Sequence, residues 1–120
     1  MANPNIVSVA SIYGKTVYDT DIAASAASLV SNAASSGKIY KINSLIISNI
    51  DGTNSADITV TLRNAAGGTT HSTIANTVAV PADATLIVVS KDTSIYLEED
   101  MSLYVLASAA GDLSATCSYE

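Results

Sequence analysis

Residues 38–50, KIYKINSLIISNI, alternate apolar and polar side chains and then become apolar in both phases. Successive side chains of a β-strand point to opposite faces, so this alternation predicts a strand with one buried face. Its even-numbered positions are the expected core face. At residues 45–47 both phases are apolar, which indicates a central strand covered on both sides. The segment is rich in β-branched residues and ends at the turn signal Asp51-Gly52, so we expect the middle strand of a β-sandwich.

Further segments show the same period of two, and turn signals separate them. Residues 56–63, 101–108 and 113–119 each alternate apolar with polar side chains, whereas residues 84–90 are continuously apolar and predict a buried strand. Shorter strands are expected at residues 74–80 and 95–97. Short strands separated by turns predict an all-β fold, an antiparallel β-sandwich of jelly-roll or Ig-like topology with about eight strands.

The first 36 residues carry weaker patterns. Residues 1–21 hold two short apolar patches, at residues 6–9 and 16–18, and we expect an extended N-terminal arm with one or two short strands. The pattern leaves open whether this arm pairs with its own sheet or with a neighbouring subunit. In residues 22–36 alanine favours a helix, but residues 27–31 also fit a strand, and we expect a strand followed by an Ala/Ser loop. Residues 22–120 are then a single β-sandwich domain after the arm of residues 1–21.

Composition narrows the functions that such a domain can have. The 120 residues include no Phe and no Trp, so the core must come from Ala, Val, Ile, Leu and the six Tyr. The net charge is −6, and the five basic residues are scattered along the chain, so we expect neither nucleic acid nor an anionic membrane as a partner. No apolar run approaches the ~20 residues of a membrane span. The N-terminus lacks the basic and apolar regions of a secretory signal, so we expect synthesis in a cytoplasm.

Two residues are candidates for a catalytic or metal-binding role. His71 is the single histidine and has no second histidine as a partner, so an exposed polar role is favoured over a general base or metal ligand. Cys117 is the single cysteine, which excludes an internal disulfide. It shares its strand phase with Leu113 and Ala115, which predicts a buried structural thiol.

Three turns are candidate binding sites. The acidic turn at residues 98–100 and the oxygen-rich loop at residues 51–57 carry ligands suited to Ca²⁺. Adjacent carboxylates on a turn diverge, however, and the loop lacks the distal glutamate of a calcium loop. The pair Gly67-Gly68 has no following Lys and no helix, so a phosphate site is not supported. We therefore expect no enzyme activity, no catalytic residue, no cofactor and no metal site.

Four motifs of strands and turns carry a family resemblance: residues 41–52 (KINSLIISNIDG), 80–86 (VPADATL), 95–100 (IYLEED) and 117–120 (CSYE). They resemble a group of small virion structural proteins of tailed phages, especially those of marine cyanobacteria. The resemblance covers roughly residues 38–120 and marks strands and turns rather than an active site. One departure is Asp100-Met101, where such proteins more often have a Gly-Asp turn.

The resemblance implies a capsid decoration (cement) protein, a non-enzymatic β-sandwich that binds the major capsid protein as a homo-oligomer, expected to be a homotrimer. It would be located on the virion after assembly in the host cytoplasm, with the arm and the loops at one end of the sandwich making the contacts. The alternative is a tail, baseplate or fibre-associated protein that binds a host surface glycan. Such a binder needs exposed aromatic rings, for which the candidates are Tyr13, Tyr18, Tyr40, Tyr96, Tyr104 and Tyr119.

Overall fold

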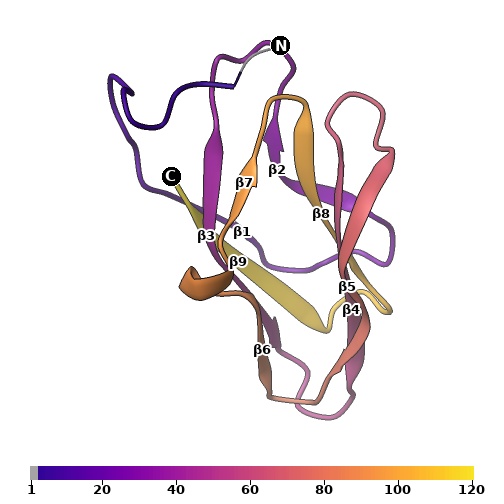
Figure 1. The fold of residues 1–120 in the computed structure, drawn as a ribbon. Coiled ribbons are helices and arrows are strands. Elements are labelled where there is room, and N and C mark those ends of the chain that lie inside the picture. Colours follow the sequence, from indigo (N-terminus) through magenta and orange to yellow (C-terminus); the bar gives the residue numbers. More distant parts are fainter. Residues whose placement is uncertain (1–2) are drawn as a thin grey trace.

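The computed structural model describes residues 3–120, which form two antiparallel β-sheets packed face to face (Figure 1). The all-β sandwich predicted from the alternating segments is confirmed. One 3-10 turn, η1 (Lys91–Thr93), interrupts the strands. The strands of the described chain are β1 (Lys15–Asp19), β2 (Ala27–Asn32), β3 (Tyr40–Asn49), β4 (Ala56–Asn64), β5 (Thr70–Val80), β6 (Thr85–Val89), β7 (Ile95–Leu97), β8 (Met101–Ala107) and β9 (Leu113–Tyr119).

The strand order is that of a jelly roll. One sheet has the order β1-β9-β3-β6, with the short β7 also paired to β3, and the other has the order β2-β8-β4-β5. The pairs β1–β9, β2–β8, β3–β6 and β4–β5 are therefore nested one inside the next along the chain. This nesting is the winding of a double-sheet jelly roll, which separates it from the Ig-like arrangement that the sequence left open.

The core between the sheets is built from aliphatic side chains, as the composition predicts. Tyr40 and Tyr119 are half-buried at its border, where their rings pack edge to face with centroids 5.2 Å apart. Among residues 3–120, the fully or almost fully buried hydrophobic side chains are Ile22, Val30, Ile42, Leu45, Ile47, Ala56, Ile58, Val60, Val80, Val89, Leu97, Leu103, Val105, Ala107, Leu113, Ala115 and Cys117.

β3 is the central strand of its sheet, between β9 on one side and β6 and β7 on the other. The prediction that its even-numbered positions face the core is correct at Ile42 and wrong beyond it. A β-bulge inserts Asn43, because Ile42 and Ser44 face consecutive residues of β9. One extra residue exchanges the two faces of a strand, so the buried positions that follow are Leu45, Ile47 and Asn49.

The apolar segment at residues 84–90 is not the buried strand that its composition suggests. It forms β6 at the edge of its sheet, where Ile87 is 62% exposed while Val89 is buried. A continuous apolar run has no period to show which side is covered, so the sequence could not reveal this edge position. In β5, the expected common face of Ile74, Val78 and Val80 is broken at Thr77, whose φ is 47°, and Val78 is exposed.

The N-terminal segment joins the sandwich at Lys15. β1 pairs with β9 of the same chain, from Lys15 opposite Tyr119 to Asp19 opposite Ala115. The strand expected at residues 27–31 is present as β2, and the expected Ala/Ser loop follows it. Residues 3–14 contain no strand, and we refer to them as the N-terminal arm. In Figure 1 this indigo segment extends away from the two sheets, at the same end of the molecule as the C-terminus.

Two buried asparagines connect the sheets near opposite ends of the sandwich. Asn49 of β3 donates a hydrogen bond from Nδ2 to the backbone oxygen of Val80 in the other sheet, at 2.9 Å. Asn32 of β2 donates in the same way to the backbone oxygen of Leu97, at 3.1 Å. Burial of an amide is favourable only when its polar atoms are bonded, so these residues fix how the two layers align.

Candidate interaction groove

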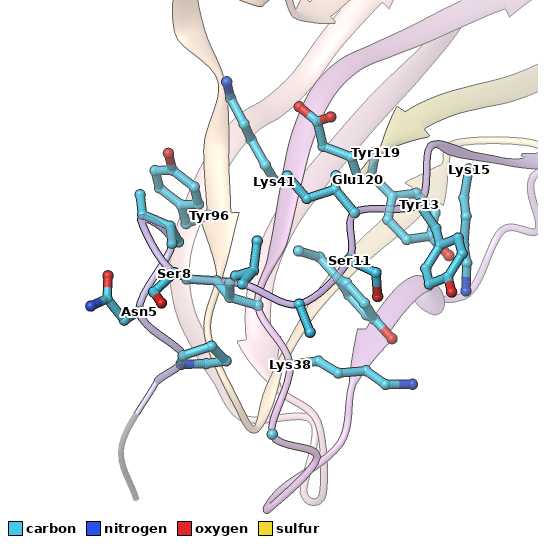
Figure 2. Close-up of a pocket in the computed structure, with 18 residues that line it drawn as sticks. Asn5, Ser8, Ser11, Tyr13, Lys15, Lys38, Lys41, Tyr96, Tyr119 and Glu120 are labelled. Carbon is cyan, nitrogen blue, oxygen red and sulfur yellow. The ribbon is translucent and has the colours of Figure 1, made fainter.

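A groove of about 720 Å³ lies between the N-terminal arm and the adjacent end of the five-stranded sheet (Figure 2). Arm residues form one wall, and the start of β3, Tyr96 of β7 and the end of β9 form the other. We call this feature the arm groove. It exists because β3 begins and β9 ends at the same point of the sheet, directly beside the arm.

The arm is attached to the sandwich through Asn3. Its Nδ2 donates to Oε1 of Glu98 at 2.6 Å, and its Oδ1 accepts from the backbone N–H of Glu99 at 3.2 Å. Within the arm, Asn5 closes a turn by accepting bonds from the backbone of residues 7 and 8. More than half of the surface of four large apolar arm residues is exposed, namely Ile6, Val7, Ile12 and Tyr13. Clustered exposed apolar side chains mark interaction sites on soluble proteins.

Four of the six tyrosines line the arm groove. Tyr13 and Tyr96 are exposed, whereas Tyr40 and Tyr119 are half-buried against the core, as their strand phases predicted. Partial burial, followed by the proximity of Tyr40, raises the pKa of the Tyr119 hydroxyl. The remaining two tyrosines lie elsewhere: Tyr18 is exposed on β1, and Tyr104 on β8 stacks under the guanidinium of Arg63 at 4.8 Å.

Three of the five basic residues also line the arm groove: Lys15, Lys38 and Lys41. The five are scattered along the chain, but the topology brings these three together, because the starts of β1 and β3 both lie beside the end of β9. Figure 2 shows Lys15 and Lys38 on the side of Ser11 and Tyr13, whereas Lys41 lies on the other side with Glu120. The groove thus combines ammonium groups with aromatic rings.

The opposite end of the sandwich is acidic, and we call it the aspartate end. Its loops follow β1, β3 and β5 and precede β9, and no Lys or Arg occurs in residues 19–26, 50–57, 81–84 or 108–113. Asp21 accepts a hydrogen bond from Gly111 N–H at 2.6 Å, which fastens two of these loops together. The combined charge of the aspartates on these segments equals the formal net charge of the chain, −6. These six residues are Asp19, Asp21, Asp51, Asp57, Asp83 and Asp112.

Asp112 gives this end a testable dependence on pH. Partial burial, followed by the charges of Asp51 and Asp21, raises the pKa of the Asp112 carboxyl. The folded state therefore holds this proton more tightly than the unfolded chain, and ionisation of Asp112 costs stability above the raised pKa. We expect Asp112→Asn to be more stable than the parent near pH 7 and equal to it below the ordinary pKa of 3.8, as measured by thermal unfolding across pH. Asp92→Asn, outside this end, should not show that pattern; a loss of stability at pH 7 in Asp112→Asn would contradict the account.

The structure does not bring together the residues weighed as catalytic groups. His71 is exposed on β5 of one sheet, whereas Cys117 is buried in β9 of the other. Burial raises the pKa of the Cys117 thiol to about 11, so it stays protonated at neutral pH, in agreement with the predicted structural role. Gly67 and Gly68 form the turn between β4 and β5.

In both candidate calcium turns, carboxylate oxygens accept hydrogen bonds from neighbouring residues of the chain. Asp51 accepts hydrogen bonds from Asn54 and from Thr53 N–H, and these bonds lower its pKa. Asp100 accepts from Asn64 Nδ2 at 2.8 Å and so joins the β7–β8 turn to the β4–β5 turn. Within residues 3–120, no three His, Cys, Asp or Glu side chains are grouped so that they could hold a metal ion.

Comparisons with known proteins add no relative: no family model, curated protein or solved structure matches this chain. Among the described residues, no helix is long and apolar enough to span a membrane.

Proposed function

We propose that this chain is a structural protein of a phage virion, a capsid decoration protein that binds the outer surface of the major capsid protein and stabilises the head. The observation that carries the proposal is the N-terminal arm, which presents exposed apolar side chains beside a jelly roll. Double-sheet jelly rolls recur in viral capsid domains, which supports the choice by analogy of fold alone. The motif resemblance across residues 38–120 points to the same class.

The arm supplies binding energy through its exposed apolar side chains. Val7 is 91% exposed and Ile6 is 51% exposed, so both gain by contact with another subunit. Full burial of a side chain of this size is worth roughly 1.5–3 kcal/mol. A few such contacts per copy, repeated in a homotrimer and over a particle surface, add up to a strong attachment.

A tail or fibre-associated protein that binds a host glycan is the second candidate. Tyr13 and Tyr96 favour it, because both are exposed and line the arm groove together with lysines. Jelly rolls also occur in lectin domains, so the fold is compatible with either function.

The location of the protein on purified particles tests the proposal. We expect the chain at junctions between capsomers, seen by electron microscopy of particles carrying a labelled copy. Heads that lack the protein should rupture at lower temperature than decorated heads, and added protein should restore them. Label on the tail or fibres would replace the proposal with the glycan-binding alternative, and absence of the chain from particles would overturn both.

A further inference from the structure

We propose that the arm groove receives the aspartate end of a second copy, so that the protein self-associates head to tail through complementary charge. The inference names the surfaces used in the homo-oligomer and in that sense rests on the proposed function. It concerns association in solution, which is measured without particles.

The charges of the chain are divided unevenly between its two ends. All six carboxylates of the aspartate end lie on segments without Lys or Arg, and the other five acidic residues match the five Lys and Arg residues in number. Hydrogen bonds from Gly111 N–H to Asp21 at 2.6 Å and from Ile50 N–H to the backbone oxygen of Asp112 at 2.7 Å hold these loops together. The charges of Asp51 and Asp21 therefore oppose ionisation of Asp112. A nearby ammonium group would relieve that repulsion.

The arm groove supplies such ammonium groups. Lys15 and Lys38 are exposed and lie on the side of the groove away from Glu120, and Lys41 is on the other side (Figure 2). Glu120 lines the same groove, and Glu98, which holds the arm, lies beside it. The three lysines outnumber these two acids, and the tyrosine hydroxyls add hydrogen-bond donors for carboxylates.

The positions of the two surfaces determine the symmetry of the contact. β3 begins at the groove and ends at the aspartate end, and its ten residues span about 30 Å. Because the two surfaces are different and distant, each copy would use both, which makes the interface heterologous. Such contacts close into a ring or continue as a filament. The homotrimer of the proposed function corresponds to a ring with three identical contacts.

Charge complementarity selects a second copy over other occupants of the groove. An anionic glycan would match the lysines but would leave the repelling carboxylates of the aspartate end without a partner. A second copy neutralises both surfaces at once. Because exposed charges are screened within about 8 Å at physiological salt, the contact should weaken as salt is raised.

Two charge-reversal variants test the inference. Lys15→Glu/Lys38→Glu makes the groove net negative, and Asp83→Lys/Asp112→Lys reduces the charge of the aspartate end from −6 to −2. Neither pair includes an Asp whose carboxylate holds a loop through a hydrogen bond to backbone N–H. Lys91→Glu and Asp92→Lys on η1 make single substitutions of the same two kinds away from both surfaces and serve as controls. Circular dichroism establishes that each variant is folded, and Lys→Gln and Asp→Asn versions replace any that is not.

Sedimentation velocity at low and high salt gives the readout. We expect the parent protein and both controls to associate at low salt, and each reversal variant alone to associate at least about tenfold more weakly, equivalent to about 1.4 kcal/mol. An equimolar mixture should form a 1:1 dimer and nothing larger, since one variant keeps its groove and the other keeps its aspartate end, while the two altered surfaces are both net negative and repel each other. A monomeric parent or a mixture that stays monomeric would overturn the inference. It would also be overturned if the groove variant lost association while the aspartate-end variant associated as strongly as the parent. The last result would favour a different anionic ligand, and none of these results depends on where the protein lies on a particle.

Discussion

Replacement of Asn49 by alanine should lower the free energy of unfolding by about 3 kcal/mol. The side chain is 3% exposed, and its Nδ2 donates to the backbone oxygens of Val80 and Asn54 at 2.9 and 3.0 Å. Its Oδ1 accepts from the backbone N–H of Asp51 at 2.8 Å. Alanine removes the two donors and the acceptor together, and it leaves the buried carbonyl of Val80 without this partner. The connection between the sheets and the start of the β3–β4 loop would be lost at the same time.

Denaturant unfolding followed by circular dichroism measures this effect. Asn76→Ala is the matched control, because Asn76 is exposed on β5, and it should change stability by less than about 0.5 kcal/mol. Asn49→Asp keeps the shape but removes both N–H donors, so it should destabilise at least as much as alanine at neutral pH. An effect of Asn49→Ala as small as that of Asn76→Ala would show that the sheets do not depend on this amide.

The fold class could be read from the sequence because most strands keep their phase. In β8 the alternation of Leu103, Val105 and Ala107 survives unchanged in the structure, and β9 keeps its own in the same way. Changes of register within a strand limit how well its buried face can be predicted from the sequence. The extra residue Asn43 exchanges the faces of β3, and no local pattern announces it, because Ile is present in both phases of this segment. The edge position of β6 depends on long-range pairing, which a single strand does not encode.

The candidate site was much harder to predict. The sequence suggested an extended arm and named the tyrosines, but Lys15 is separated from Lys38 and Lys41 by β2 and meets them only through the jelly-roll winding. The six aspartates were also dispersed along the chain, and their concentration at one end follows from which loops share that end. One usable signal was present: the three lysines lie near the first residues of β1 and β3, whereas the six aspartates lie in turns or near strand ends.

Removal of residues 1–13 should abolish association while leaving the sandwich folded. The deletion stops before Lys15 because β1 is part of the sheet and pairs with β9. The described side-chain bonds from the arm to the sandwich are those of Asn3 with Glu98 and Glu99, so the expected loss of stability is about 1 kcal/mol or less. The same deletion removes one wall of the arm groove and the exposed Ile6 and Val7. Two further variants localise the effect: Ile6→Ser/Val7→Ser should lose capsid binding, and Ile87→Ser on the β6 edge is the matched apolar control.

Thermal unfolding and sedimentation of the chain without residues 1–13 form the most direct test of whether the arm is the assembly element of an independently folded jelly roll. The account predicts an unchanged β-sheet spectrum, a midpoint within a few degrees of the parent, and a monomer that no longer joins other copies or heads. Loss of the β-sheet signal would show that the arm belongs to the folded core. An intact spectrum with unchanged association would show that the contacts lie elsewhere on the sandwich.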